Sequence, residues 1–240
     1  MNYISLGHFC SVALELEKFG LRTESSPFDW LISDFESVIS AIETHFDDFL
    51  NYDHLSQDKK LHYLYYDSKY KCSFHHDFDK YAPLKKQLPV VQSKYARRIN
   101  RFYKTIQEPT LFIRYISSKQ NEEGKSKELV WIEENYDRII SLLKSFNKDN
   151  DILFIANEDV TSEMLTIYNV EKDENDSVAR QPFCKSPVLF EMFSSIDFPN
   201  KEANIARYNK KYSKINKVPR KIKAILKKIF LKEYIHDVQF

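Results

Sequence analysis

Two apolar segments on either side of an amphipathic one constrain the fold of this chain more than any other feature. Residues Thr110 to Ser117 (TLFIRYIS) and Asp151 to Ala156 are almost continuously apolar. Between them, residues Lys127 to Phe146 carry apolar side chains at the three- and four-residue spacing of a helix. Strands that are apolar on both faces are typical of a parallel sheet covered by helices, and strand, helix, strand is its repeating unit. We therefore predict a layered α/β fold with a mostly parallel sheet flanked by helices.

The first twenty residues predict a further strand and helix that can join this sheet. Tyr3 to Leu6 is apolar, and Gly7 permits the sharp turn and close backbone approach found where a strand enters a helix beside a ligand. After Cys10, apolar residues follow at helical spacing as far as Phe19, and Gly20 is a typical helix stop. The whole chain has only three glycines, and two of them, Gly7 and Gly20, lie at the two ends of this one helix. This position indicates a structural requirement.

Cys10 is predicted to lie in the first turn of this helix. There the unpaired backbone N–H groups and the positive end of the helix dipole favour the thiolate and lower the pKa of a cysteine. This is the position that a nucleophilic cysteine requires. A free cysteine is also among the residues most often buried as a small apolar side chain, so packing without chemistry is the alternative role of Cys10.

The remaining segments complete the expected topology. The patterns predict, in chain order, a helix at 35–50, a β-hairpin at 61–74, a basic helix at 88–106, a strand at 164–170 and a flexible polar loop at 171–177. The hairpin has an aromatic, alternating pattern that is interrupted by the turn-forming pair Asp67-Ser68. The prediction is therefore a mostly parallel sheet with an inserted β-hairpin.

A His-His-Asp sequence at 75–77 follows the predicted hairpin. A histidine at the end of a strand can approach a cysteine carried by a helix and act as its base. A solvated strand end is the alternative. His75 and His76 are expected to point to opposite faces if the strand continues. A zinc site that combines this cluster with Cys72 is not favoured, because no second ligand cluster follows at finger-like spacing.

Several motifs together resemble a known family. They are Ser5-Leu6-Gly7, Cys10, Ala13, Leu16, Gly20-Leu21-Arg22, Ser26-Pro27-Phe28-Asp29-Trp30, Phe46 to Leu50, His76-Asp77-Phe78, Arg97-Arg98, Arg101-Phe102 and Arg114-Tyr115. This set resembles a bacterial family described as papain-like cysteine peptidases, a domain of unknown function. The resemblance implies Cys10 as the nucleophile and His76, in the HDF motif, as the base. It also implies an α+β papain-like arrangement, with a helical lobe and an antiparallel barrel, as the alternative to the parallel sheet.

Two acids, a tryptophan and the glycine turn are further candidates for the site. Asp29 precedes Trp30 in the link between two helices, where it can line the site or cap the loop. Trp30 is either a wall of the site or a core residue. Asp77 can orient the imidazole beside it, although an acid from another segment is better placed to do so. The turn supplies backbone N–H groups that can hold an oxyanion, and its candidate residues are Gly7, His8 and Ser11.

Three arginines and an asparagine complete the predicted substrate-binding set. Arg98 and Arg101 lie on the basic helix, where they can clamp a carboxylate or a phosphate or remain solvated. Arg114 lies inside an apolar strand, so it must be paired or face a ligand. Asn157 follows the next strand and is either a site residue or part of a turn. Because ligands gather at the carboxyl ends of parallel strands, the strand-end residues can share one crevice with Cys10.

Composition excludes several classes of protein. The chain has 240 residues, 42% of them hydrophobic, which suffices for one main domain, predicted at 1–200. Its net charge of +1 provides no overall attraction to nucleic acid. The three cysteines are too far apart for a disulfide framework or a structural zinc site, and a reducing cytoplasm suits them. We find no secretion signal, membrane span, metal motif or cofactor motif, and therefore expect a cytoplasmic protein without metal or cofactor.

The C-terminal segment at 201–240 is predicted to be a basic amphipathic helix. Lysines and arginines recur from Lys214 to Lys232 without an acid, and Pro219 is placed to start the helix. Such a helix can lie on an anionic surface at the inner face of the membrane, or it can dock on its own domain. Nucleic acid is not an expected partner, because the basic residues carry no stacking aromatics and no known binding motif.

The leading functional hypothesis is a cysteine-dependent acyl hydrolase or transferase for a peptide, acyl or sugar-containing substrate. Cys10 attacks a carbonyl, and His76 accepts and returns the proton. The first alternative is a transferase for glycosyl or phosphate-bearing substrates in bacterial surface polysaccharide biosynthesis, in which arginines bind phosphate and Cys10 only packs. The phosphate-binding motifs GxGxxG and GxxxxGK[ST] are both absent. The second alternative is a non-catalytic binding domain that keeps the scaffold of an enzyme.

Overall fold

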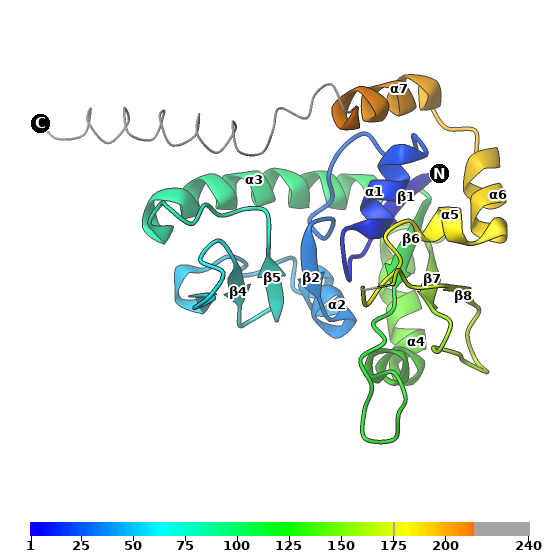
Figure 1. Ribbon diagram of the computed structural model, residues 1–240, viewed down its shortest axis with the longest axis horizontal. Coiled ribbons are helices and arrows are strands. Elements are labelled where there is room, and N and C mark those ends of the chain that lie inside the picture. Colours follow the sequence, from blue (N-terminus) through cyan, green and yellow to red (C-terminus); the bar gives the residue numbers. More distant parts are fainter. Residues whose placement is uncertain (175, 214–240) are drawn as a thin grey trace, which may run out of the picture.

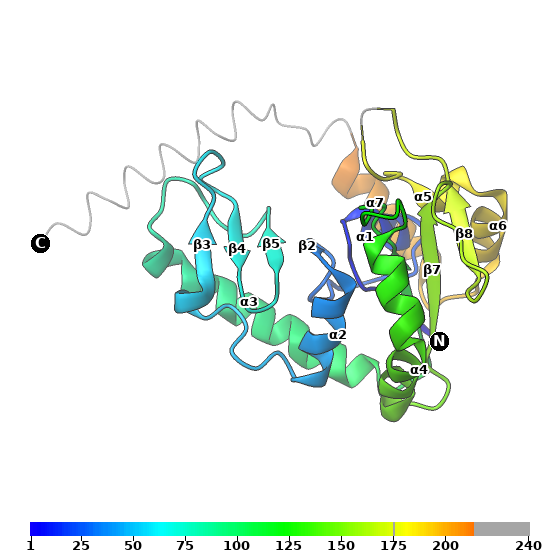
Figure 2. The same ribbon diagram turned by 90° about the horizontal axis from the view of Figure 1, so that it is seen from below.

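A computed structural model describes residues 1–174 and 176–213 of the chain (Figures 1 and 2). Its first sheet is parallel and contains, in spatial order, β1 (Asn2–Ser5), β6 (Thr110–Tyr115), β7 (Asp151–Asn157) and β8 (Ile167–Val170). Ser5 lies opposite Ile113, and Tyr115 lies opposite Ile155. The predicted parallel sheet is confirmed, and the Gly7 turn lies at its carboxyl edge.

Helices cover both faces of this sheet. One face carries α1 (Ser11–Lys18), α5 (Pro182–Lys185) and α6 (Pro187–Ser195), with α7 (Lys201–Tyr212) packed on α1. The other face carries α2 (Phe35–Glu43), α3 (Leu84–Thr105) and α4 (Lys127–Phe146). Successive strand residues point to opposite faces, so Ile113 joins the core under α1 and Phe112 joins the core under α3. This burial of both faces explains the continuous apolar sequence of the strands.

A second, antiparallel sheet lies beside the first (Figure 2). Its strands are, in spatial order, β2 (Leu31–Ser33), β5 (Cys72–Phe74), β4 (Tyr65–Asp67) and β3 (Leu55–Gln57), and β3 follows the short 3₁₀ helix η1 (Tyr52–His54). The predicted hairpin is confirmed as β4 and β5. The buried Asp67 closes its turn by accepting hydrogen bonds from the backbone N–H groups of Lys69 (3.0 Å) and Tyr70 (3.2 Å). The hairpin forms the middle of a four-stranded sheet rather than an isolated insertion.

The long helix α3 packs against both sheets (Figure 1). The ring of Tyr95 lies 5.6 Å from that of Phe74 in β5, and the ring of Phe102 lies 6.3 Å from that of Phe112 in β6. All four rings are buried, and such aromatic pairs contribute about 0.5–1.5 kcal/mol beyond the area they bury. One helix therefore fixes the antiparallel sheet relative to the parallel sheet.

The helix predicted at 35–50 ends earlier than expected, at Glu43. Several residues after it have positive φ angles: His45, Phe46, Asp48 and Leu50. This left-handed backbone cannot continue a right-handed helix. It turns Phe46 into the core, where its ring lies 5.3 Å from that of Phe28. Tertiary packing of aromatic side chains therefore overrides the helical pattern of the sequence here.

The basic helix predicted at 214–232 lies outside the described residues. The domain boundary predicted after residue 200 and the contact with a membrane therefore stay predictions. Among the described helices, none is long and apolar enough to cross a membrane. The described part of the C-terminal segment is α7, whose Lys211 pairs with Glu17 of α1 at 2.7 Å. This ion pair joins α7 to the helix that follows Cys10.

Candidate active site

A pocket of about 240 Å³ lies between the start of α1 and the end of β5. It is lined by Phe9, Cys10, Trp30, Leu31, Ile32, Tyr63, His75 and His76. Cys10 follows β1 of the parallel sheet, whereas His76 follows β5 of the antiparallel sheet. The pocket therefore brings together the two residues that the sequence predicts as nucleophile and base, at the junction of the two sheets.

Cys10 is the N-cap residue of α1 and is half-buried. Burial raises the pKa of its thiol above the ordinary value, and the carboxylate of Asp176 acts in the same direction. The backbone N–H of Cys10 and the guanidinium of Arg180 oppose this rise without cancelling it. The sequence predicts a lowered pKa at the helix N-terminus, but desolvation of the charged sulfur outweighs that effect in this pocket. Cys10 is therefore a neutral thiol at pH 7 that requires a base.

Both histidines reach the pocket because β5 ends at Phe74 and the chain bends through 75–77. The strand does not continue past Phe74, so the opposite orientation that we expect of His75 in a continuing strand does not apply. Burial, and then the charge of His76, lower the pKa of His75, so His75 is neutral at pH 7. The exposed imidazole of His76 packs edge-on against Trp30, with 5.9 Å between ring centres. Trp30 is thus a wall of the pocket that limits the orientation of His76.

Asp29 is fully buried and holds the loop that leads to Trp30. It forms an ion pair with Arg22, and it accepts a hydrogen bond from the backbone N–H of Ser26 at 2.8 Å. Arg22 in turn lies over the Trp30 ring, 5.9 Å from its centre. Asp29 therefore positions Trp30 and does not line the pocket.

Asp77 is also held by partners on another element. It forms an ion pair with Lys94 and accepts a hydrogen bond from the Tyr95 hydroxyl at 2.9 Å, both in α3. These contacts attach the bend that carries His76 to α3.

In the described part of the chain, no group of three or more His, Cys, Asp or Glu side chains could hold a metal ion.

Within the turn between β1 and α1, Gly7 faces Ser33 rather than the pocket. Gly7 has a φ of +78°, and a Cβ atom there would lie 3.1 Å from Ser33 Oγ and 3.3 Å from Arg114 Nη1. Conformation and space therefore both require glycine. Burial, and then the charge of Arg114, lower the pKa of His8, and Ser11 is buried at the start of α1. Gly7 and His8 precede Cys10 and Ser11 follows it, and none of the three lines its pocket.

Arg114 is fully buried and fully paired. Its guanidinium forms two hydrogen bonds of 2.8 Å with the carboxylate of Glu128 in α4. It also donates to the carbonyl oxygens of Leu6 and Ser33, both at 2.8 Å, and stacks over the Phe35 ring at 5.1 Å. Of the two roles predicted for Arg114, the structure shows the paired one, which ties β6 to α4, to β2 and to the residue that follows β1.

Asn157, at the end of β7, is likewise bound to protein groups. It accepts a hydrogen bond from the Tyr115 hydroxyl at 2.6 Å and donates one to the carbonyl oxygen of Ser177 at 2.9 Å. The Tyr115 hydroxyl accepts a hydrogen bond from the backbone N–H of Ala179 at 2.9 Å. This network attaches the end of the predicted loop to the carboxyl edge of the parallel sheet, and Arg180 follows directly.

Arg180 and Asp176 are residues near the site that the sequence did not indicate. Their charges act on the Cys10 sulfur with opposite sign, and their side chains form an ion pair of 2.8 Å. No motif or periodicity marks either residue. Their placement depends on hydrogen bonds that the loop makes with two distant strands, and local sequence does not report such bonds.

Asp176→Asn and Arg180→Gln are expected to shift the pKa of Cys10 in opposite directions. Asp176→Asn removes a negative charge that raises the pKa, so the pKa should fall. Arg180→Gln removes a positive charge that lowers it, so the pKa should rise further. The pH dependence of Cys10 alkylation by iodoacetamide, in a Cys72→Ser, Cys184→Ser background, measures both shifts. Shifts of the same sign would contradict the placement of this ion pair beside Cys10.

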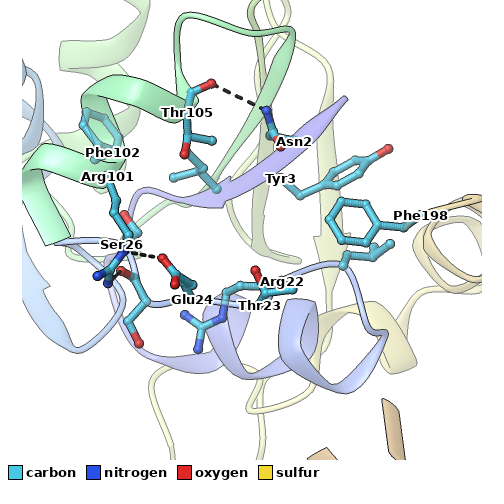
Figure 3. Close-up of a pocket in the computed structure, with 13 residues that line it drawn as sticks. Asn2, Tyr3, Arg22, Thr23, Glu24, Ser26, Arg101, Phe102, Thr105 and Phe198 are labelled. Carbon is cyan, nitrogen blue, oxygen red and sulfur yellow. Dashed lines mark hydrogen bonds and ion pairs between the residues drawn. The ribbon is translucent and has the colours of Figure 1, made fainter. Parts of the chain in front are cut away.

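A second pocket, of about 160 Å³, lies between β1, α3 and the loop at 22–26 (Figure 3). Arg101 lines this pocket, forms an ion pair with Glu24 and donates to the carbonyl oxygen of Ser25 at 3.3 Å. Arg98 lies one turn earlier on α3. Neither arginine lines the pocket of Cys10, so the predicted substrate-binding residues do not all meet in one cavity.

Comparison with known proteins bears on the residues of this pocket. The model of the family described as "Putative papain-like cysteine peptidase (DUF1796)" matches residues 1–158, which include Cys10 and both histidines. The chain belongs to this family. It is also similar to "Uncharacterized protein R408" of Acanthamoeba polyphaga mimivirus, with 31% identity over 176 residues that cover 65% of this chain and 77% of that protein. No solved structure matches the chain.

Membership in the family agrees with the resemblance carried by the motifs, but two expectations need adjustment. The relative with a stated source is viral, so it does not support the bacterial origin that the resemblance implied. The family member described here also combines a parallel sheet with a separate antiparallel sheet. The family label alone, which implies a helical lobe and an antiparallel barrel, would not have predicted the parallel sheet.

Proposed function

We propose that this protein is a cysteine-dependent acyl hydrolase or acyltransferase in which Cys10 is the nucleophile and His76 is the base. The observation that carries the proposal is the pocket that Cys10 and His76 line together. A nucleophilic cysteine and its base commonly come from separate elements that meet at one cavity. The family description supports a cysteine peptidase in the broad sense.

The raised pKa of Cys10 defines the task of the base. A neutral thiol is a weak nucleophile, so its proton must leave as the sulfur attacks. The imidazole of His76 is exposed to the pocket and is limited in orientation by Trp30. His75 is the competing base, because it is neutral and lines the same pocket. His76 is preferred as the base because His76-Asp77-Phe78 matches the HDF motif of the family.

The reaction then proceeds in two steps. Cys10 Sγ forms a bond to the carbonyl carbon of the substrate while the thiol proton passes to His76, and the leaving group departs with that proton. The product of this step is a thioester on Cys10. Water attacks the thioester, gives a proton to His76 and releases the acid as that proton returns to the sulfur. An alcohol or amine in place of water makes the same enzyme a transferase.

The walls of the pocket restrict the acyl group. Apart from the histidines and Cys10, the lining side chains are apolar or aromatic: Phe9, Trp30, Leu31, Ile32 and Tyr63. An apolar segment next to the scissile carbonyl fits these walls, because burial of apolar surface contributes roughly 25 cal/mol per Å². We therefore propose a substrate whose carbonyl carries a short apolar acyl chain.

Trapping of the acyl-enzyme tests this function. The protein, in a Cys72→Ser, Cys184→Ser background, is mixed with the thioester butyryl-N-acetylcysteamine at pH 7 and quenched in acid. We expect peptide mass spectrometry to find the butyryl group on Cys10, and we expect Cys10→Ala to carry none. An unmodified Cys10 together with no release of N-acetylcysteamine would contradict the proposal and favour a non-catalytic binding role for the pocket.

A further inference from the structure

Three cationic side chains recur along α3 at three- and four-residue spacing: Lys94, Arg98 and Arg101. The outer two are neutralised by acids of neighbouring segments. Lys94 pairs with Asp77 of the histidine bend, and Arg101 pairs with Glu24 of the loop beside β1. Arg98 lies on α3 between these two ion pairs, and in the described part of the chain it is paired with no acid of its own.

Arg98 forms no ion pair or hydrogen bond within residues 1–174 and 176–213. Its guanidinium lies 5.0 Å from the centre of the Tyr95 ring, and its Nη1 atom is buried without a hydrogen-bond acceptor. A guanidinium is always charged and presents five N–H donors in a fixed plane. A buried donor without an acceptor is unfavourable, so an acceptor supplied by a ligand would stabilise this arrangement.

Two side chains connect Arg98 to the pocket of Cys10. Arg98 lies close enough to Arg22 for its charge to disfavour the charged form of that guanidinium. Arg22 lies 5.9 Å from the centre of the Trp30 ring, and Trp30 packs edge-on against His76. Arg22 is already neutralised by two carboxylates. Arg98 is therefore the neighbouring cation with donors to offer to a ligand that extends past Trp30.

We propose that Arg98 binds a carboxylate or phosphate group of the substrate whose acyl carbon reaches Cys10. This assignment rests on the function proposed above and adds a substrate class to it. The substrate is an acyl compound with an apolar segment in the pocket and an anionic group beyond Trp30. Both anions match the guanidinium, which binds either of them through two parallel hydrogen bonds.

Fluorescence of Trp30 tests the anion site without any need for catalysis. In a Trp131→Phe background, Trp30 is the remaining tryptophan, and it both lines the pocket and lies against Arg22. Titration with inorganic phosphate and with glutarate distinguishes the two anion classes. We expect a saturable change with at least one of them, and Arg98→Gln should weaken the binding by about ten- to a hundredfold. No saturable change with either anion would overturn the proposal.

The neighbouring Arg97 provides a matched control. Arg97 is exposed and donates to Ser93 Oγ at 3.0 Å, so Arg97→Gln removes the same charge from the same helix. Arg97→Gln should leave the affinity for the anion unchanged. If Arg97→Gln and Arg98→Gln weakened the binding equally, the loss would reflect the net charge of the helix and not a site at Arg98, and the proposal would be overturned. Arg98→Lys keeps the charge without the planar fork, and it should retain part of the binding. A Lys variant that binds as tightly as the parent would show that charge alone suffices and would contradict recognition through two parallel hydrogen bonds.

Competing thioesters connect this site to the reaction. Glutaryl and butyryl thioesters of N-acetylcysteamine differ mainly by a terminal carboxylate. We expect Cys10 to be acylated faster by the glutaryl compound, and Arg98→Gln should reduce this preference about tenfold. An unchanged preference would overturn the assignment of Arg98. If neither thioester acylates Cys10, the proposed function fails, whereas the titration of Trp30 still decides whether Arg98 binds an anion.

Discussion

Replacement of His76 by alanine is expected to lower kcat/KM for thioester hydrolysis at pH 7 by about 10²- to 10⁴-fold, the usual contribution of a general base. The effect should be large because burial keeps Cys10 protonated, so the protein has little preformed thiolate with which to react in the absence of a base. Steady-state hydrolysis of the butyryl thioester measures it. Addition of imidazole should restore part of the rate in the variant.

His75→Ala is the matched control for this experiment. Both imidazoles line the pocket, and they are neighbours in the sequence. If His76 is the base, His75→Ala should retain most of the activity, because it removes a ring of the same size from the same bend. The opposite result, a large loss with His75→Ala and a small one with His76→Ala, would transfer the role of base to His75. Equal activity of both variants and the parent would remove histidine from the mechanism.

Replacement of Arg114 by methionine is expected to lower the free energy of unfolding by about 3–5 kcal/mol, the usual cost of removing one partner of a buried ion pair and leaving the other charge buried and unpaired. The variant leaves the carboxylate of Glu128 buried without its two hydrogen bonds, and it leaves the carbonyl oxygens of Leu6 and Ser33 without a donor. Equilibrium unfolding in urea, followed by circular dichroism, measures the change. Removal of both charges, in Arg114→Met with Glu128→Leu, should recover much of the loss.

The ion pair between Arg138 and Glu43 provides the control. It has similar geometry, with Arg138 Nε 2.8 Å from Glu43 Oε1, but 51% of the arginine side chain is exposed. Arg138→Met should therefore cost no more than about 1 kcal/mol. If the two substitutions had equal effects, the stabilising role assigned to the buried pair would be wrong. A strong effect limited to Arg114 would show that the junction of the two sheets depends on it.

Much of the fold follows from local sequence. The strands at β1, β6 and β7 and the helix α4 are predictable because their apolar periodicity records burial on one or both faces. The hairpin of β4 and β5 is predictable from its alternating aromatic residues. Short strands such as β2 and β3, with three residues each, carry too few residues for a pattern to be distinguished from a loop. The early end of α2 depends on where Phe46 packs, which its own segment does not encode.

The candidate site divides in the same way. Sequence alone determines that Cys10 lies beside a helix N-terminus, that two histidines follow a strand, and that Arg114 must be paired or face a ligand. Only the tertiary structure decides that both histidines line one pocket with Cys10 and that burial raises the pKa of the thiol. It also decides that the partner of Arg114 is the carboxylate of Glu128. Residue type and spacing report the local backbone and the burial of one element. Protonation and pairing depend instead on charges and solvent exclusion contributed by other elements, and those are set when the two sheets and α3 pack together.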